Sequence, residues 1–515
     1  MNRTTGMAAP RVVVIGAGMG GLAAAADLAR RGAAVTVLER AATPGGKMRE
    51  VMVGGSPIDG GPTVFTMRWI FEGLFADAGT SLEAALSLQK ADILARHAWR
   101  TGGRLDLFAD ITRSADAIGD FAGAAEARGY RAFCARSADI FRTLRGSFIA
   151  AERPSPLDLV KRVGITNIGA LIRTVPMKTL WDALGEHFRD PRLHQLFGRY
   201  ATYCGCSPWL APATLMLVAH VEQDGVWFVK GGMRRVADAI QRLAEAKGAD
   251  FRFGAEVAEI LTRQGRASGV RLANGEEIPA DAVLFNGDVA ALAQGLLGQA
   301  PRGAAEDTPR AARSLSAVTW CVKAPTSGFP LVHHNVFFAE DYAAEFDAIF
   351  RRRNITAAPT VYICAQDREA GPGPAQGTPE RMLVLINAPP DGDQRGHTPD
   401  EIAELGERGF GLLKACGLDV ARSTGEEVVT TPEGFARLFP GSGGALYGRA
   451  GHGSSATFAR PGAVTRLQGL YLAGGSVHPG PGIPMAAMSG RIAAARLLED
   501  WAGARGTIRI GAGRA

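Results

Sequence analysis

The chain has 515 residues, six scattered cysteines and a net charge of +6 that is spread along its length. This length predicts at least two domains, and the longest apolar runs fall well short of the roughly 18 residues that span a bilayer. The isolated cysteines favour a reducing cytoplasm and indicate no metal site. The modest charge indicates no nucleic-acid partner but is compatible with weak attraction to anionic lipid headgroups.

A strand, a helix and a second strand are predicted within the first forty residues. Residues 12–15 are mostly β-branched, which is typical of a strand buried on both faces of a parallel sheet. A small-residue helix follows over about 20–31, and a second apolar strand covers 35–38. This order predicts the βαβ unit that opens a dinucleotide-binding domain.

The turn between the first strand and the helix has G-x-G-x-x-G spacing. Gly16 allows a tight turn, Gly18 lets the backbone approach a pyrophosphate, and Gly21 lets the helix pack closely on the strand. The helix N-terminus directs its N–H groups at that pyrophosphate. Glu39 ends the second strand, where a carboxylate can hold a ribose hydroxyl. Because the spacing occurs together with both strands and the acid, we predict that the chain binds a dinucleotide.

Two further glycine-rich turns favour FAD over a nicotinamide dinucleotide. They are Thr43–Lys47, which follows the second strand, and Asp59–Thr63, which follows a short hairpin-like stretch. Glycines at these points keep side chains away from a large cofactor, and Thr63 can offer it a hydroxyl. Ordinary turn chemistry is the alternative explanation for each segment taken alone.

The middle of the chain divides into a helical part and a mixed part. Residues 64–215 have a mainly helical pattern, and 165–187 mix apolar with basic side chains. For 165–187 two interpretations stay open: an amphipathic segment in a bilayer interface, or a helix pair packed on the protein's own core. From 231 a helix, strands and a hairpin turn at Asn274-Gly275 suit the middle of a glutathione-reductase-like fold. The helix is predicted over 232–244 and the strands over 251–253, 256–262, 280–286, 318–322, 335–338, 360–364 and 381–387.

Histidine spacing gives little sign of function in this part of the chain. His333 and His334 are adjacent, so on a strand they would point to opposite faces, one into the core and one into solvent.

The C-terminal region holds another glycine-rich turn. Leu470–Ser476 is typical of a strand that runs into such a turn, and a helix of small residues opens at Met485 and reaches Leu498. The N-terminus of this helix can stabilise negative charge on the pyrimidine edge of a reduced flavin. His478 lies next to the turn and is the nearest candidate for a catalytic acid–base group, with local hydrogen bonding as the alternative.

These segments stand in the order found in carotenoid desaturases of the bacterial phytoene-desaturase type, which the chain resembles over nearly its whole length. The closing block, Leu470–Gly490, is more similar to the hydroxyneurosporene (methoxyneurosporene) dehydrogenase branch than to phytoene desaturases. The resemblance implies an FAD-dependent 1-hydroxycarotenoid 3,4-desaturase of the spheroidene and spirilloxanthin pathway.

The resemblance also implies an α/β fold with two discontinuous domains. A Rossmann-like FAD-binding domain of the glutathione-reductase/amine-oxidase type would cover 1–63, 220–290 and 455–515. A mixed α+β domain that faces substrate and membrane would cover 64–219 and 291–454.

The family's cofactor site can be carried over residue by residue. The Val257 backbone would contact adenine, and Lys47 would line the flavin. Related amine oxidases often have an acidic residue where Ser476 stands. The full set of implied FAD-binding residues is Gly16, Gly18, Gly20, Gly21, Glu39, Arg40, Lys47, Gly61, Pro62, Thr63, Val257, Gly475, Ser476, Pro484 and Met485.

The implied substrate is a long apolar carotenoid that gives a hydride to flavin N5. No second dinucleotide motif is found, which suits a quinone or oxygen as the electron acceptor. The implied location is cytoplasmic, at the membrane surface. Alternative functions are phytoene desaturation, amine oxidation, and non-enzymatic lipid binding on the same fold.

Overall fold

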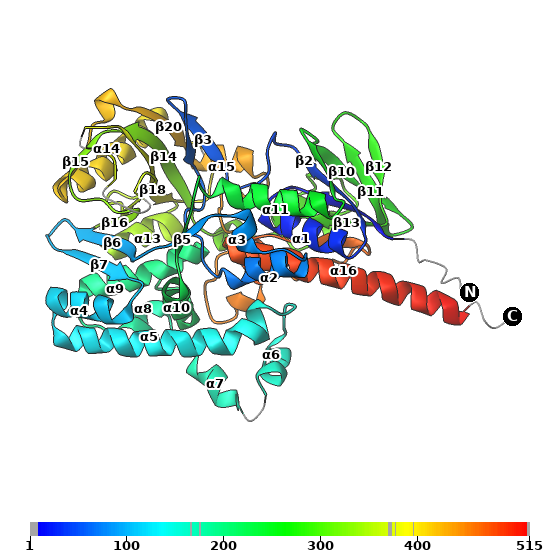
Figure 1. Cartoon of the computed structure of the whole chain (residues 1–515), viewed down its shortest axis with the longest axis horizontal. Coiled ribbons are helices and arrows are strands. Elements are labelled where there is room, and N and C mark those ends of the chain that lie inside the picture. The colour runs from blue at the N-terminus through cyan, green and yellow to red at the C-terminus, as the bar shows by residue number, and fades with distance from the viewer. Residues whose placement is uncertain are drawn as a thin grey trace.

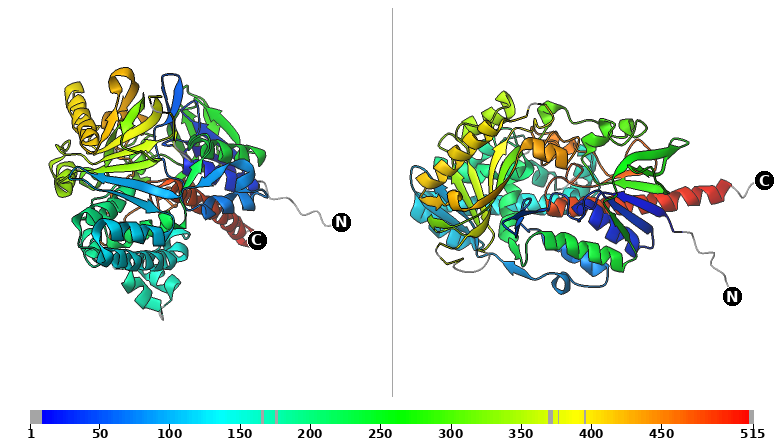
Figure 2. Two further views of the ribbon diagram at one scale, coloured as in Figure 1. Left: turned by 60° about the vertical axis from the view of Figure 1, so that its left-hand side comes forward. Right: turned by 90° about the horizontal axis from the view of Figure 1, so that it is seen from above.

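The computed structural model describes residues 9–511 except 165–166, 175–176, 369–372, 376 and 395. Four positions of the predicted amphipathic segment 165–187 therefore lie outside the described residues. Figure 1 shows two sheet-containing layers side by side, with a group of helices below one of them. Helix α16 extends away from the body at the other end of the molecule (Figures 1 and 2).

The first layer is a five-stranded parallel sheet with the order β21-β13-β1-β2-β9. Both faces of its central strand are buried, as the β-branched run predicts. Val12 and Val14 pack against helices α1, α11 and α16, whereas Val13 and Ile15 pack against strands β10 and β11. The strands are β1 (Arg11–Ile15), β2 (Ala34–Glu39), β9 (Asp250–Phe253), β13 (Ala282–Phe285) and β21 (Leu470–Leu472).

Helices cover one face of this sheet and a small antiparallel sheet covers the other. The helices are α1 (Met19–Arg30), α11 (Arg234–Ala246) and α16 (Ile483–Gly511). The small sheet consists of β10 (Val257–Arg263), β11 (Arg266–Leu272) and β12 (Glu277–Pro279), with the turn at Asn274-Gly275 between the last two. This is a Rossmann-like arrangement whose strands come from three separate parts of the chain.

The second layer is a seven-stranded sheet with the order β20-β14-β18-β17-β16-β6-β7. Helix α14 (Pro399–Ala415) covers one of its faces through Ile402, Leu405 and Leu413. The strands are β6 (Ile93–Trp99), β7 (Arg104–Phe108), β14 (Ser316–Ala324), β16 (His334–Phe338), β17 (Val361–Ala365), β18 (Glu380–Ala388) and β20 (Glu426–Thr430).

The mainly helical pattern predicted for 64–215 is wrong over residues 88–108, which follow the helices α2 (Trp69–Asp77) and α3 (Leu82–Ala85). Strands β5 (Leu88–Lys90), β6 and β7 lie there, and β6 pairs in parallel with β16. Burial alternates along β7 but not along β6, and neither strand shows locally that β6 pairs with a strand about 240 residues later.

Helices form a separate cap beyond β6 and β7. Their apolar faces make one core with aromatic residues such as Phe133, Phe188 and Phe197. The cap contains α4 (Ile111–Ala122), α5 (Ala124–Leu144), the π-helical η1 (Arg145–Ile149), α6 (Pro156–Val163), α7 (Ile168–Arg173), α8 (Leu180–Leu184), α9 (Pro191–Gly198), the 3₁₀ helices η3 (Arg199–Cys204) and η4 (Ala213–Met216), and α10 (Leu217–Asp224). Within the described part of the chain, no helix is long and apolar enough to cross a membrane.

A short hairpin connects the two layers. Its strands are β3 (Glu50–Val53) and β4 (Ser56–Asp59). Val51, Val53 and Ile58 form one buried cluster with residues of the seven-stranded sheet. The remaining elements are α2 (Trp69–Asp77), α3 (Leu82–Ala85), β8 (Trp227–Val229), α12 (Val289–Ala293), α13 (Tyr342–Asp347), α15 (Pro432–Leu438), the paired β15 (Thr326–Gly328) and β19 (Leu418–Val420), and several single 3₁₀ or π turns.

Candidate active site

A cavity of about 1060 Å³ lies where the carboxyl ends of the parallel strands face the seven-stranded sheet and the helical cap. This is larger than the pockets that hold drug-sized molecules, and it can accommodate a dinucleotide together with part of a long substrate. Its lining includes every predicted cofactor residue except Gly21, which lies behind the wall. The predicted residues that line it are Gly16, Gly18, Gly20, Glu39, Arg40, Lys47, Gly61, Pro62, Thr63, Val257, Gly475, Ser476, Pro484 and Met485.

The glycine turn is shaped by close approaches of backbone to backbone. Gly16 has a φ of +94°, a conformation that L side chains rarely adopt. A Cβ on Gly21 would lie 2.1 Å from the carbonyl oxygen of Gly16. A Cβ on Gly490 of α16 would lie 2.0 Å from the carbonyl oxygen of Gly20, so α16 can cross α1 this closely only because position 490 lacks a side chain. The cradle therefore depends on the C-terminal helix as well as on the N-terminal motif.

The carboxylate of Glu39 is buried beneath the same turn. Its two oxygens accept hydrogen bonds from the backbone N–H groups of Ala17 (2.7 Å) and Ala41 (2.8 Å). A carboxylate has about four acceptor positions, so Glu39 keeps capacity for a ribose hydroxyl. Arg40, beside it, donates to the carbonyl oxygens of Arg437 and Leu438.

Two buried cations line the cavity, and neither forms a salt bridge among the described residues, although the charge of Asp288 acts on both. The ammonium of Lys47 donates to the carbonyl oxygen of Leu446, and burial lowers its pKa. The guanidinium of Arg460 donates to the carbonyl oxygens of Tyr447 (3.0 Å), Gly475 (3.0 Å) and Arg449, and burial lowers its pKa as well. Buried charges normally require a partner. Together with the side-chain-free cradle, these cations fit an anionic dinucleotide.

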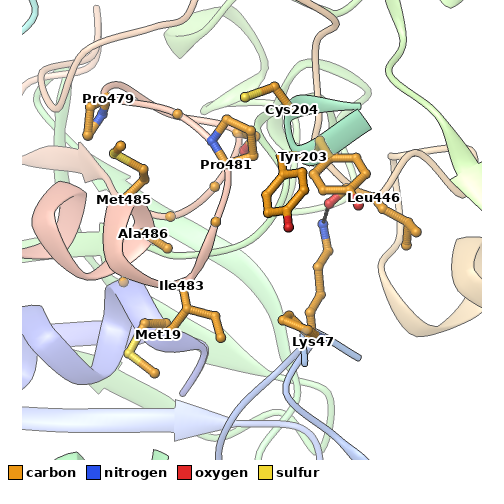
Figure 3. A pocket seen from close by; sticks show the side chains of 18 of the residues that line it. Met19, Lys47, Tyr203, Cys204, Leu446, Pro479, Pro481, Ile483, Met485 and Ala486 are labelled. Carbon is orange, nitrogen blue, oxygen red and sulfur yellow. Dashed lines mark hydrogen bonds between the residues drawn. The ribbon is translucent and has the colours of Figure 1, made fainter. Parts of the chain in front are cut away.

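The C-terminal turn forms the wall opposite Lys47. Figure 3 shows Pro481 and Ile483 on this turn, with Met485 and Ala486 in the first turn of α16 and Lys47 across the cavity. The hydroxyl oxygen of Ser476 accepts a hydrogen bond from the N–H of Val289 (3.2 Å), so it connects the turn to α12. Gly61 lies close to the lysine, because a Cβ there would be 1.8 Å from the carbonyl oxygen of Lys47.

His478 is buried behind this turn and does not line the cavity. Its Nε2–H donates to the carbonyl oxygens of Phe148 (3.0 Å) and Ala151 (2.9 Å), which end the π-helical segment η1. Burial lowers the pKa of His478 to about 4, so the ring is neutral at physiological pH. This geometry makes His478 a positioning residue between the turn and the helical cap, and a catalytic role stays a prediction.

The structure corrects the prediction for the other histidine pair. Both His333 and His334 are buried, and neither is solvated. His333 Nε2 lies 3.3 Å from Cys364 Sγ, and His334 Nδ1 lies 2.8 Å from the hydroxyl of Tyr362. The chain is irregular just before β16, so the two rings turn toward each other in a T-shaped contact rather than to opposite faces.

Sequence reasoning missed a set of polar residues in the cavity. The Tyr362 hydroxyl is 2.7 Å from the Thr63 hydroxyl, which lies on the flavin side. On the helical side, Glu222 accepts hydrogen bonds from Tyr200 (2.8 Å) and Tyr203. These residues carry no local motif, and they come together only because η3, α10 and β17 converge in space.

Comparison with known proteins decides the family. The family model described as flavin containing amine oxidoreductase matches residues 19–498. The chain belongs to this family. Hydroxyneurosporene desaturase of Rubrivivax gelatinosus is 57% identical over 95% of this chain and 93% of its own length. A 1-hydroxycarotenoid 3,4-desaturase of a Flavobacterium species is 31% identical over 94% of this chain and 98% of its own.

Solved structures support the same assignment at the level of the fold. Putrescine oxidase superposes with a TM-score of 0.57 at 16% identity, covering 96% of this chain and 99% of its own. The predicted fold, with its Rossmann-like FAD-binding part, is therefore confirmed, and so is the predicted membership of the carotenoid desaturases. As a member of the flavin-containing family, the protein is an FAD-dependent oxidoreductase. The roles of the individual residues stay predictions.

Proposed function

We propose that the protein desaturates an acyclic 1-hydroxycarotenoid at C3–C4, with FAD as the hydride acceptor. One observation carries the proposal: the cavity that contains the glycine cradle continues without interruption into an apolar space under the helical cap. That space is lined by Leu144, Phe148, Leu159, Val160 and Leu171. A polyene can lie along it with one end at the flavin turn. The names of the relatives point to the same substrate class.

The chemistry requires little of the protein beyond positioning. FAD, when bound, would supply the hydride acceptor for a desaturation that removes a hydride from one carbon of the C3–C4 pair and a proton from the other. The apolar lining holds the polyene in place and excludes water from the reacting carbons. Lys47 and the N-terminus of α16 place positive potential near the C-terminal turn, where a reduced flavin gathers negative charge.

We also propose that the protein works in the cytoplasm at a membrane surface, where carotenoids dissolve. Helices α6 and α7 support this, because they line the cavity with Leu159 and Leu171 and expose other apolar residues outward. Leu157, Ile172 and Met177 are 73%, 71% and 83% exposed. Figure 1 shows α6 and α7 as the part of the cap that projects furthest from the two sheets.

Basic residues occur in the same stretch of chain as these exposed apolar residues. Lys161, Arg173 and Lys178 lie in the same short stretch of chain. Apolar residues that enter the acyl region, next to cations that meet anionic headgroups, are the features of an interfacial anchor. An entrance at this point would pass substrate from the bilayer into the cavity without exposing it to water.

The decisive experiment is anaerobic. The FAD-loaded protein is mixed in liposomes with 1-hydroxyneurosporene or with phytoene, the flavin absorbance is followed, and products are identified by chromatography. Flavin bleaching and a longer chromophore from the hydroxylated substrate alone are expected. Bleaching by phytoene instead would make the enzyme a phytoene desaturase. Bound flavin that neither carotenoid reduces would overturn the proposed substrate.

The same sample tests the electron acceptor, which we propose is a quinone or oxygen. After anaerobic reduction, a ubiquinone analogue is added and the return of flavin absorbance is timed against the return in air. Reoxidation by either within the turnover time supports the proposal. A flavin that stays reduced with both would contradict it.

The membrane proposal is tested by vesicle flotation. The triple variant Leu157→Ser, Ile172→Ser, Met177→Ser is expected to lose about tenfold or more in binding to anionic vesicles, with unchanged thermal stability because these side chains are exposed. Met52→Ser, Leu210→Ser, Val464→Ser is the matched control, since these are exposed apolar residues elsewhere on the surface. Equal loss of binding in both variants would contradict a localised anchor.

A further inference from the structure

A group of charged and polar side chains is buried where the helical cap lines the cavity. The carboxylate of Glu222, on α10, is 8% exposed and lines the cavity. The Tyr200 hydroxyl donates to one of its oxygens at 2.8 Å, and the Tyr203 hydroxyl donates to the other. The guanidinium of Arg199 lines the same space and lies 5.1 Å from the centre of the Tyr362 ring. We call Arg199, Tyr200, Tyr203 and Glu222 the polar end of the cavity.

Nothing in hydride transfer from a hydrocarbon explains this arrangement. A buried carboxylate is costly unless hydrogen bonds satisfy it, and two tyrosine hydroxyls fill only about two of its four acceptor positions. Burial raises the pKa of Glu222, whereas the two tyrosines and Arg199 act in the opposite direction. Glu222 and Arg199 line the same cavity, and the positive charge of Arg199 is near enough to act on the carboxylate. This pairing is suited to a ligand group that both donates and accepts a hydrogen bond.

We propose that the polar end binds the tertiary hydroxyl at C1 of the carotenoid substrate. Glu222 accepts the hydroxyl proton, and Arg199 donates to the hydroxyl oxygen. This assignment rests on the proposed function and adds the residues that select the hydroxylated substrate.

The position of the polar end agrees with the short separation between the substrate hydroxyl and the bond that is desaturated. The hydroxyl is on C1, only two bonds from C3, so whatever binds it must lie close to the flavin. Figure 3 shows Tyr203 projecting into the cavity between the turn that carries Pro481 and the side chain of Lys47. With the hydroxyl held there, the polyene extends away along the apolar lining toward α6 and α7.

The polar end would also discriminate against carotenoids that lack the hydroxyl. A carotenoid with the same skeleton but no hydroxyl would cover the carboxylate and the guanidinium without pairing them. Sites built to hydrogen-bond a substrate hydroxyl discriminate strongly against the analogue that lacks it, because their buried polar groups are then left unpaired. The unhydroxylated precursors, which share the same membrane, would thereby be excluded from the flavin.

The test compares two substrates that differ in one atom, 1-hydroxyneurosporene and 1,2-dihydroneurosporene. The conservative variant Glu222→Gln keeps the volume but removes the charge. We expect kcat/KM for the hydroxylated substrate to fall about 10- to 100-fold, mainly through KM, which corresponds to the loss of a charge-assisted hydrogen bond. For the deoxy substrate kcat/KM should stay within about twofold of the wild-type value or rise, since no hydroxyl contact is lost. Tyr203→Phe should move the ratio in the same direction by a smaller factor.

Controls separate this role from folding and from the proposed function. Glu126→Gln changes another buried glutamate of the helical cap, which accepts from the N–H of Arg189 and does not line the cavity. It should leave the substrate ratio unchanged, and flavin content and melting temperature should report on folding in all variants. A Glu222→Gln variant that loses activity equally on both substrates would overturn the hydroxyl assignment alone. If the wild type reduces its flavin with neither substrate, the proposed function fails and this assignment fails with it.

Discussion

The two walls of the cavity are built in different ways. The flavin wall consists mostly of backbone, small residues and helix ends, in short segments with strict spacing such as Gly16–Gly21 and Gly475–Met485. The substrate wall consists of side chains from the helical cap and from β17, which meet only in three dimensions. A wall made of backbone tolerates almost no added atom, whereas a wall made of side chains can change its occupant by single substitutions. On the proposed function, this difference would separate the residues that hold the cofactor from those that select the substrate.

The largest effect should come from adding one carbon directly behind the flavin wall, where α16 crosses α1. In Gly490→Ala the new Cβ would lie 2.0 Å from the Gly20 carbonyl oxygen, so α16 must move away from α1. We expect a loss of about 3 kcal/mol or more in the free energy of unfolding, together with loss of bound flavin. Chemical denaturation and the flavin absorbance per protein measure both.

Gly411→Ala is the matched control, because a Cβ at this position of α14 meets nothing within 4 Å. It should be neutral or slightly stabilising. Full flavin content and normal stability in Gly490→Ala would show that the flavin wall is as adaptable as the substrate wall. This outcome would contradict the proposed difference between the two walls.

The contact between the two walls should respond to pH through His478. Its pKa is lowered from 6.5 in the unfolded chain to about 4 in the native protein, so protonation favours the unfolded state. The stability it contributes is present above pH 6.5 and is lost as the pH falls through about 4, by up to about 3 kcal/mol. Denaturation curves of wild type and His478→Gln between pH 4 and 7 should therefore converge toward the acid end.

The pH profile of activity tests independently whether His478 is a positioning residue or a catalytic one. If His478 only positions the turn against η1, His478→Gln should lower flavin content or stability but keep the shape of the pH profile of kcat. Disappearance of an ionisation from that profile would instead identify a catalytic role.

A smaller effect is expected on the substrate wall. Tyr362→Phe removes the hydroxyl that lies 2.7 Å from the Thr63 hydroxyl and 2.8 Å from His334 Nδ1. The ring that fills the space stays, so we expect a loss of about 1–2 kcal/mol with flavin content unchanged. Flavin loss in Tyr362→Phe would show that side chains of the substrate wall also hold the cofactor.

The same division determines what could be predicted from the sequence. Gly16, Gly18 and Glu39 are recognisable because a βαβ turn around a pyrophosphate imposes a fixed spacing on them. The buried strand at 12–15 was equally clear, since both of its faces are covered. The cofactor residues that the family resemblance implied are brought together by the fold in one cavity.

The residues that could not be predicted are those whose surroundings come from distant parts of the chain. Glu222 sits on an ordinary-looking helix, and its partners Tyr200 and Tyr203 belong to a different one. Arg460 was not singled out from the sequence, because nothing near it in sequence shows that three carbonyl groups converge on it. His333 and His334 were assigned to opposite faces because strict strand alternation was assumed where the strand had not yet begun.

The hairpin β3–β4 has a consequence for how the molecule melts. It directly follows the flavin-lining turn in sequence, yet its apolar side chains lie in one cluster with Cys321 and Leu383 of the other sheet. Asp59 and Gln366 also exchange two hydrogen bonds, through the Asp59 N–H (2.9 Å) and its carbonyl oxygen (3.0 Å). The hairpin also contacts the first layer, because the Asp59 carboxylate accepts a hydrogen bond from the N–H of Met233 (2.7 Å) at the start of α11. We therefore expect the two layers to unfold as one cooperative unit. Free energy gained by binding FAD, about 4 kcal/mol at a thousandfold excess over Kd, would thereby also stabilise the seven-stranded sheet.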